Sequence, residues 1–351
     1  MNKPIATVSN PNGMDCENEF LKKHNILKLD EFTELNNDRT SVNEKITNKV
    51  ITKHELLSQF KVELSLLETC KNKIKGELEK TDDVIETQIL VSLCKRIIDL
   101  FDHIHVMFSI EEDLLFCFIN FCLDNALCIN AEQLDILLEA VLRIEDNQKI
   151  WIQLLKLHLK LNNFDKLMHV FREGVRTLKN NSLPLWKILI RHLKKRRPDM
   201  VQQLLEEGTT ILYDNISMEI RPKYLEWCIE FKDLELTRYL FNKLIMLKPA
   251  CCKLYLTMID IETDQSDLDL DVVRKLFDAA CTLFGRDNIK VWIEYIRFEH
   301  TDGSQKLKRS IVSKALWKLE TNLKDIFLDE YNNLEREFRK DLGNEVVTID
   351  D

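Results

Sequence analysis

The residues best suited to metal chemistry are cysteines and histidines between positions 103 and 128. His103 and His105 precede Cys117, Cys122 and Cys128 along the chain. Zinc sites usually contain two cysteines separated by two residues, and no Cys-x-x-Cys pair occurs in this sequence. We therefore expect no metal site, and we interpret the ten cysteines as small apolar core residues rather than as ligands or disulfides.

Motifs that bind nucleotides or catalyse hydrolysis are absent from the sequence. It contains no G-x-x-x-x-G-K-[ST] or G-x-G-x-x-G loop, and no H-E-x-x-H or G-x-S-x-G signature. The eight histidines include no pair four residues apart. We therefore expect a protein without enzymatic activity or cofactor. An enzyme with its site in residues 53–150 is an alternative, although no polar residue there points to a reaction.

The densest positive cluster lies between Arg191 and Arg197, in a chain of formal net charge −9. Its charged residues are Arg191, Lys194, Lys195, Arg196 and Arg197, and Pro198 follows them. Three interpretations stay open: a nuclear-import signal, a contact with RNA phosphates, or a helix C-terminus whose cations complement the helix dipole. Because the whole chain is acidic, we expect any RNA contact to be local.

Three glutamates follow large apolar residues at one fixed spacing. The copies are Trp292-x-x-Tyr295-x-x-x-Glu299, Tyr255-x-x-Met258-x-x-x-Glu262 and Leu328-x-x-Tyr331-x-x-x-Glu335. Spacings of three and four place the three residues of a copy on one helix face. A carboxylate on a core-facing side requires a backbone N–H or a basic side chain as its partner. After Trp151 and Trp186, His158 and Leu193 stand in the glutamate position.

The helices that carry these residues recur along the chain. A large residue opens an amphipathic helix about every 36 residues, with successive intervals of 36, 35, 38, 31, 37 and 36. Two helices per period with no strand pattern predict an all-α solenoid of helical hairpins. Seven glycines and six prolines in 351 residues provide few turns for strands. The opening residues are Leu115, Trp151, Trp186, Tyr224, Tyr255, Trp292 and Leu328.

The second helix of several periods has a small residue at its centre. Trp151 pairs with Gly174 and Trp186 with Gly208. Glycine inside a helix costs about 0.5–1 kcal/mol relative to alanine, so we expect these glycines to allow close contact between crossing helices. A glycine that ends its helix is the alternative. The other residues that we expect to define the repeats are Tyr224, Trp227, Tyr255, Glu262, Ala280, Trp292, Tyr295, Glu299, Ala315 and Tyr331.

The pattern changes along the chain and predicts four regions. Residues 1–50 have no sustained period and are expected to form a disordered or loosely ordered leader. Apolar periodicity at 53–80 and 84–106 predicts a degenerate helical hairpin within 51–110, followed by the solenoid at 111–340 and a flexible tail at 341–351. No secretory signal or run of about 18 apolar residues occurs, so we expect a protein of the cytosol or nucleus.

The repeat motif resembles the half-a-tetratricopeptide (HAT) repeat, whose first helix carries W-x-x-Y-x-x-x-E. The last half of the chain resembles, more specifically, the C-terminal repeats of the U3 small nucleolar RNA-associated protein 6 family. We extend this resemblance over residues 90–340. The segments that carry it are Lys223-Tyr224-Leu225-Glu226-Trp227, Phe241 with Lys248-Pro249, Val273 to Ala280, and Leu283 to Tyr295.

The resemblance implies a function. It implies a non-catalytic scaffold of the small-subunit processome in the nucleolus, with processome proteins and the U3 small nucleolar ribonucleoprotein as partners, acting in processing of precursor ribosomal RNA and maturation of 18S ribosomal RNA. The family's N-terminal conserved region is not found in residues 1–50, so the chain resembles the C-terminal part of such a protein. A HAT-repeat adaptor in splicing or mRNA 3′-end formation is the alternative, and homodimerisation stays open.

Overall fold

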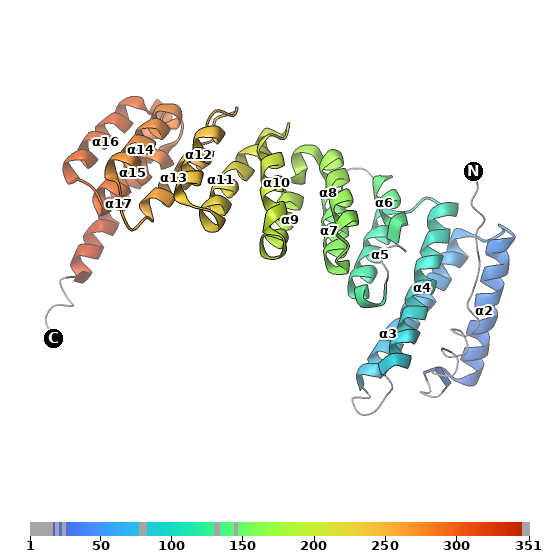
Figure 1. The fold of residues 1–351 in the computed structure, drawn as a ribbon. Coiled ribbons are helices and arrows are strands. Elements are labelled where there is room, and N and C mark those ends of the chain that lie inside the picture. Colours follow the sequence, from blue (N-terminus) through green and yellow to red (C-terminus); the bar gives the residue numbers. More distant parts are fainter. Residues whose placement is uncertain are drawn as a thin grey trace, which may run out of the picture. The chain divides into compact units, whose positions relative to one another are not determined.

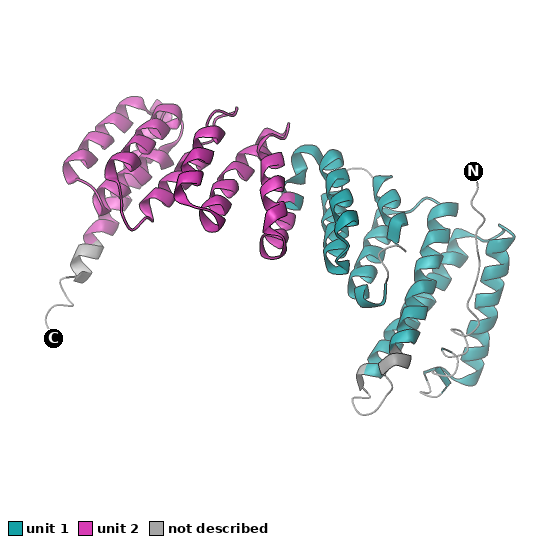
Figure 2. Cartoon of the chain, viewed as in Figure 1, with its two compact units in different colours: residues 1–185 teal, residues 186–351 magenta. Residues whose placement is uncertain are grey.

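The computed structural model describes residues 17, 21–22, 26–76, 83–129, 134–143 and 147–345. Every regular element within these ranges is a helix, and consecutive helices form hairpins (Figure 1). The predicted all-α solenoid of helical hairpins is confirmed. The chain forms two compact units, residues 1–185 and residues 186–351 (Figure 2). Among the described residues, none of the helices combines the length and apolar character of a membrane span.

Unit 1 is built from hairpins whose helices pack in chain order. α3 packs on α4, and α7 contacts both α5 and α8. Phe101 of α4 stacks on Phe118 of α5 with ring centroids 3.7 Å apart, and both rings are fully buried. The helices are α2 (Leu29–Thr47), α3 (Lys53–Gly76), α4 (Asp83–Met107), α5 (Glu112–Asp124), η1 (Ala126–Cys128), α6 (Asp135–Leu142), α7 (Gln148–Leu161), α8 (Phe164–Leu178) and η3 (Lys179–Ser182).

Unit 2 repeats the arrangement. α11 packs on α10 and α12, and also on α13, the first helix of the next hairpin. α15 likewise packs on α17, so first helices of neighbouring hairpins are in contact, as in other helical repeats. The helices are α9 (Leu183–Arg196), which begins three residues before the unit boundary, α10 (Pro198–Thr209), α11 (Asp214–Phe231), α12 (Leu234–Leu244), α13 (Cys252–Thr263), α14 (Leu270–Phe284), α15 (Ile289–Thr301), α16 (Gln305–Lys318) and α17 (Thr321–Glu345).

Side-chain caps explain where many of these helices begin. Asn163 accepts a hydrogen bond from the backbone N–H of Lys166 and starts α8. Asn147, Asp233, Asp269 and Asn288 cap α7, α12, α14 and α15 in the same way. Each cap satisfies a backbone N–H that has no partner within the helix, which contributes about 1 kcal/mol. Polar residues between the apolar runs therefore divide the chain into short helices.

The expectation of an unstructured leader is wrong for residues 29–47, which form α2. The buried face of α2 consists of Leu35 and Arg39. Its apolar periodicity is weak because an arginine occupies a core position, where an ion pair with Glu63 of α3 compensates its charge. Residues 1–16 of the expected leader lie outside the described residues. α3 and α4 lie where the sequence predicts a helical pair. Residues 77–82, between these two helices, are also not among the described residues.

Two predictions for α17, the C-terminal helix, are wrong. Leu328, expected to open the last repeat as a core residue, is exposed, whereas Phe327 is fully buried. Phe327, Leu334 and Phe338 share one face of α17, so the buried face is shifted by one residue from the predicted register. α17 also continues to Glu345, into the segment that we expected to be a flexible tail. Residues 346–351 of that tail lie outside the described residues.

Candidate functional site

The tryptophans and glycines of the central repeats are in direct contact. A Cβ atom added to Gly174 would lie 2.9 Å from Cε3 of Trp151 and 2.7 Å from Cδ1 of Leu185. One added to Gly208 would lie 3.0 Å from Cζ3 of Trp186. The alternative was that each glycine ends its helix. Gly174 and Gly208 instead lie within α8 and α10, and no glycine in the described ranges has the positive φ typical of a glycine that ends a helix. The ring of each tryptophan occupies the space that a side chain would need.

The other aromatic residues of the motif also pack inside the repeats. The indole Nε1 of Trp292 donates to the carbonyl of Gly285 at 2.8 Å. Tyr295 stacks on Phe277 with ring centroids 4.6 Å apart. Tyr255 makes an edge contact with Phe241 at 5.3 Å. Tyr224 lies 6.0 Å from Trp227, centroid to centroid, and Ala280 and Ala315 are fully buried.

The motif glutamates of the last three first helices each bind a basic residue of the preceding second helix. Glu262 of α13 accepts from Nε and Nη2 of Arg238 of α12, at 2.7 and 2.8 Å. Glu299 of α15 accepts from Arg274 of α14 at 2.8 and 3.1 Å. Glu335 of α17 lies 2.7 Å from the Lys308 amine of α16. The basic partner stands 24 to 27 residues before its glutamate in each case.

The electrostatics of these pairs favour their charged forms. The hydrogen bond to Glu262 raises the pKa of Arg238, and the one to Glu299 raises the pKa of Arg274. Partial burial alone would raise the pKa of Glu335, but the hydrogen bond and charge of Lys308 hold it below its usual value. Burial and the neighbouring Glu335 raise the pKa of half-buried Tyr331. These ion pairs lock adjacent helices together and present no free group for catalysis.

A further copy of this pair, which the sequence did not predict, lies near the N-terminus. Glu63 of α3 accepts from Nε and Nη2 of Arg39 of α2, both at 2.7 Å, and both side chains are buried. The corresponding sequence is Leu56-x-x-Gln59-x-x-x-Glu63, which has the spacing of the tryptophan motif. The motif is hard to recognise here because Leu56 and Gln59 stand in place of its aromatic residues.

The basic run lies at the end of α9 and the start of α10. Arg191, Lys195, Arg196 and Arg197 are exposed. Lys194 forms an ion pair with Glu230 and lies 5.9 Å from the centre of the Phe231 ring, and Arg197 lies 3.8 Å from Asp199. The last turn of α9 is basic, as expected for cations that complement a helix C-terminus.

The charge of the chain is strongly segregated, and the basic run is only the end of a longer basic segment. Residues 149–197 contain thirteen lysines and arginines but only two acidic residues, which gives a net charge of +11. Residues 1–148 have a net charge of −11 and residues 198–351 one of −9. The overall charge of −9 therefore conceals a basic centre between two acidic segments.

Unit 2 exposes one large apolar residue at the end of each second helix. Leu212 and Met246 follow α10 and α12, while Leu283 and Trp317 are the penultimate residues of α14 and α16. Their side chains are 92, 77, 54 and 84% exposed, and they recur at intervals of 34, 37 and 34 residues. We call these four residues the apolar row.

Two members of the apolar row lie on helix ends that are bonded to each other. The Lys318 amine donates to the carbonyl of Thr282 at 2.9 Å, next to Leu283 and Trp317. The N–H of Glu320 donates to the carbonyl of Arg286 at 3.0 Å. Neighbouring hairpins therefore place Leu283 and Trp317 at the same edge of unit 2. Exposed apolar residues that recur on one edge are typical of a protein-binding surface.

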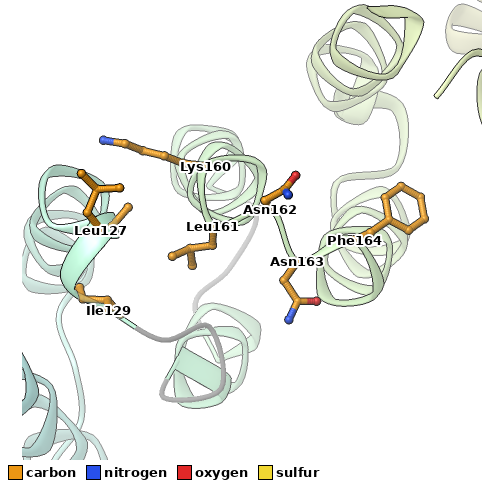
Figure 3. A pocket seen from close by; sticks show the side chains of 8 residues that line it. Leu127, Ile129, Lys160, Leu161, Asn162, Asn163 and Phe164 are labelled. Atoms are coloured by element: carbon orange, nitrogen blue, oxygen red, sulfur yellow. The ribbon is translucent and has the colours of Figure 1, made fainter. Parts of the chain in front are cut away.

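A cavity of about 570 Å³ lies in unit 1 between η1 and the turn that joins α7 to α8 (Figure 3). Leu127 and Ile129 face Lys160 and Leu161 across it (Figure 3). Its polar groups have structural partners: the Lys160 amine donates to the carbonyl of Leu123, and Asn163 caps α8.

The cysteines and histidines considered for a metal do not converge. Among the described residues, no group of three or more metal-ligating side chains is close enough to hold an ion. His105 and Cys122 are buried, whereas Cys117 is exposed. Burial raises the pKa of the Cys122 thiol well above its usual value, which keeps it protonated and apolar in character.

Comparison with known proteins finds a matching family and similar solved structures. Residues 130–315 match the model of the U3 small nucleolar RNA-associated protein 6 C-terminal family. A search of curated proteins finds no significant match. The crystal structure of the C-terminal part of a TPR repeat-containing protein from Cytophaga hutchinsonii is similar at 13% identity and a TM-score of 0.33, covering 79% of this chain and 98% of that one.

The matched segment contains most of the repeat motif. It begins near α6 and ends within α16, so it includes the contacts of Trp151, Trp186 and Trp292 and the ion pairs of Glu262 and Glu299. It also spans more than half of the chain. The chain therefore belongs to the U3 small nucleolar RNA-associated protein 6 C-terminal family, as its C-terminal repeats predicted.

Proposed function

We propose that this protein is a non-catalytic scaffold of the small-subunit processome, acting with the U3 small nucleolar ribonucleoprotein in precursor ribosomal RNA processing and 18S ribosomal RNA maturation. The observation that carries the proposal is the family match over residues 130–315, because that family is named for its association with U3 small nucleolar RNA. Family membership supports a role in ribosome biogenesis, and hence a nuclear and nucleolar location.

The described surfaces suit a scaffold. The polar groups of the cavity in unit 1 are engaged in a helix cap and a backbone hydrogen bond, and the motif glutamates are neutralised by arginine or lysine. The apolar row instead offers exposed anchor residues at regular intervals along unit 2. Large apolar side chains at the centre of an interface supply much of its binding energy. The partner that we assign to the row is a processome protein that presents an apolar segment.

The basic run at the end of α9 fits nuclear import. Arg196 and Arg197 are exposed beside Pro198, and an import receptor reads such a cluster on an accessible segment. The test is the location of a fluorescently tagged chain in which Arg196 and Arg197 are changed to Ser. Import through this run predicts retention in the cytoplasm, whereas unchanged nuclear accumulation contradicts it.

The scaffold proposal is tested by crosslinking and affinity purification of the tagged chain from nuclear extract, with the bound proteins and RNAs both identified. U3 small nucleolar RNA and processome proteins are the expected result. Spliceosomal or polyadenylation partners would instead support a HAT-repeat adaptor in pre-mRNA processing and contradict the proposal. Size-exclusion chromatography with light scattering on the purified chain separately decides whether it forms a homodimer.

A further inference from the structure

Most of the apolar row lies on an edge of unit 2 that is rich in lysine. This edge consists of the ends of α12, α14 and α16, the turns that follow them, and the first residues of the next helices. Residues 242–253, 282–290 and 314–324 cover it, and they contain eight lysines and arginines but only two acidic residues. We call these three segments the basic edge. The members of the apolar row within it are Met246, Leu283 and Trp317.

The turns at the other end of the hairpins have the opposite charge. Residues 262–271, from the end of α13 to the start of α14, contain five aspartates and glutamates and no lysine or arginine. Residues 230–235 and 299–304, at the turns of the neighbouring hairpins, contain five further acidic residues and one lysine. The positive charge of these turns is therefore gathered on the edge that carries the apolar row.

Two lysines stand directly beside members of the row. Lys243 lies three residues before Met246, and Lys314 lies three residues before Trp317, so each lysine shares a helix face with its apolar neighbour. The turn after α12 keeps this geometry, because the N–H of Met246 donates to the carbonyl of Lys243 at 3.3 Å. Both lysines are exposed, and among the described residues neither forms an ion pair with a carboxylate. The Lys243 amine lies 4.8 Å from the centre of the Tyr239 ring, which leaves its charge without a counter-ion.

The helix dipole does not account for the charge of the basic edge. Cations complement a helix C-terminus, but the dipole opposes them at an N-terminus. Lys253, Lys290 and Lys324 nevertheless stand in the first turns of α13, α15 and α17. Among the described residues, only Lys253 of these three has a carboxylate partner, Glu219 at 3.1 Å. The remaining charge therefore fits an anionic ligand from outside the chain.

Hydrogen bonds hold the turns of the basic edge in place. The buried Arg221 of α11 donates to the carbonyls of Lys248 and Pro249, at 2.9 and 2.6 Å, and so fixes the turn that follows Met246. The side-chain amide of Asn288 donates to the Cys252 thiol at 3.3 Å, which joins this turn to the one between α14 and α15. The bond between α16 and α14 described above joins the third turn. A surface that is fixed before binding loses less conformational entropy when a partner docks.

The exposed apolar side chains favour an acidic protein segment over RNA. Aromatic residues and methionine are enriched in protein interfaces, whose central apolar side chains supply much of the binding energy. RNA bases stack on aromatic rings, and Trp317 is the only aromatic residue of the row. Met246 and Leu283, which are 77 and 54% exposed, gain nothing from phosphate groups. A chain with both carboxylates and apolar side chains satisfies the lysines and the row together.

We propose that Met246, Leu283 and Trp317, together with the lysines of the basic edge, bind an acidic segment of a partner protein in which Leu or Phe side chains alternate with Asp or Glu. The apolar side chains contact the row, and the carboxylates pair with Lys243 and Lys314. Leu212 is not included, because residues 206–214 around it contain no lysine or arginine. The inference rests on the proposed function for the identity of the partner and adds the chemistry of the segment that docks.

The test is fluorescence anisotropy of a labelled peptide of repeated Glu-Leu-Glu-Gly units, titrated with the purified full chain. Two matched peptides replace every glutamate with glutamine or every leucine with serine. The variants are K243E/K314E, which reverses two charges of the edge, and M246S/W317S, which removes two apolar anchors. The control is K275E/K306E, which changes the net charge equally at exposed lysines in the first halves of α14 and α16. Circular dichroism melting verifies that each variant remains folded.

The expected result is that the chain binds the Glu-Leu-Glu-Gly peptide at least about tenfold more tightly than either matched peptide. M246S/W317S should weaken this binding by at least about tenfold and K243E/K314E by at least about fivefold, while the control changes it by less than about twofold. Added salt should weaken binding of the glutamate peptide more than binding of the glutamine peptide. Absence of binding, equal binding of the glutamate and glutamine peptides, or equal weakening by the control would overturn the proposal.

A labelled RNA hairpin in the same assay separates the two classes of ligand. RNA binding that K243E/K314E weakens at least about tenfold, but M246S/W317S leaves unchanged, would assign the edge to a polyanion and overturn the proposal. Preference for the glutamate peptide without processome proteins in the nuclear purification would contradict the scaffold function alone. Recovery of processome proteins by a chain that shows no such preference would contradict the acidic segment alone.

Discussion

Arg274 on α14 donates two hydrogen bonds to the buried carboxylate of Glu299 on α15, from Nε at 2.8 Å and from Nη2 at 3.1 Å. Oε2 of Glu299 also accepts from the backbone N–H of Ser304 at 2.8 Å, so both oxygens have partners. A bidentate pair of this geometry is among the stronger polar contacts in proteins. It joins the second helix of one repeat, α14, to the first helix of the next repeat, α15.

Breaking this pair should destabilise unit 2. We expect R274M to lower the free energy of unfolding by about 2 kcal/mol, because it leaves the fully buried carboxylate without its counter-charge. A double-mutant cycle of R274M with E299Q, measured by urea denaturation, should give a coupling of about 1–3 kcal/mol. The control is R297M, which removes exposed pairs with Glu294 and Glu337 and should cost less than about 0.5 kcal/mol. A coupling near zero would show that the pair is not energetically linked.

Trp292 and Trp317 form a matched pair for testing the repeat register. Trp292 is buried and bonded to the Gly285 carbonyl, whereas Trp317 is exposed. We expect W292A to cost about 3–5 kcal/mol, as for other large core truncations, and to loosen the last repeats together. W317A should change stability by less than about 0.5 kcal/mol. Denaturant unfolding followed by circular dichroism gives both values, and similar values for the two variants would refute the register.

Gly174 should not tolerate a methyl group. Alanine gains about 0.5–1 kcal/mol of helix propensity over glycine, but its Cβ would lie 2.7 Å from Leu185 and 2.9 Å from Trp151. We expect the clash to dominate, so that G174A lowers stability by about 1–2 kcal/mol. S310A, at an exposed position of α16, should leave the melting temperature unchanged or raise it slightly. A stabilised G174A would mean that α8 shifts away from Trp151 without cost.

His158 should make unit 1 sensitive to mild acid. Its ring is buried and its Nδ1 has no hydrogen-bond partner among the described residues. Burial, with the nearby Lys166 charge, lowers the pKa of His158 to about 4. The unfolded chain, with a pKa near its usual 6.5, therefore binds more protons between these values. Stability is full above about pH 6.5 and should fall by up to about 3 kcal/mol as the pH drops to 4.

The measurement for His158 is urea denaturation between pH 4 and pH 7. H158Q keeps a polar side chain of similar length but cannot titrate, so its stability should depend less on pH over this range. An identical pH dependence in H158Q and the unchanged chain would assign the acid sensitivity to other groups.

The apolar row should be separable from folding. Because its four side chains are at least half exposed, replacing Leu212, Met246, Leu283 and Trp317 with Ser should leave the melting temperature within a few degrees. The same variant should lose processome proteins in affinity purification, because it lacks the apolar anchors. A control with Tyr239 changed to Ser alters an exposed ring outside the row. Full recovery of the partners by the fourfold variant would contradict the assigned surface.

The sequence by itself determined the repeat and the aromatic and glycine positions that fill the core of its central helices. Recurring Trp151, Trp186 and Trp292, with Gly174 and Gly208 in the following helices, predicted hairpins that the structure contains, because aromatic side chains need the space that glycine leaves. The spacing of Glu262 and Glu299 placed a carboxylate on the same face as the aromatic residues. These patterns are local, and helix geometry converts them directly into faces.

Only the tertiary structure decided which residue meets each carboxylate. Arg238 and Arg274 stand 24 and 25 residues before their glutamates, and many other basic residues have comparable separations. Packing likewise selected Phe327 rather than Leu328 for the core of α17, since a register shift of one residue leaves the amphipathic pattern almost unchanged. Arg39 became a core residue because Glu63 is buried opposite it. Such pairings depend on contacts across helices, and no single-helix period encodes them.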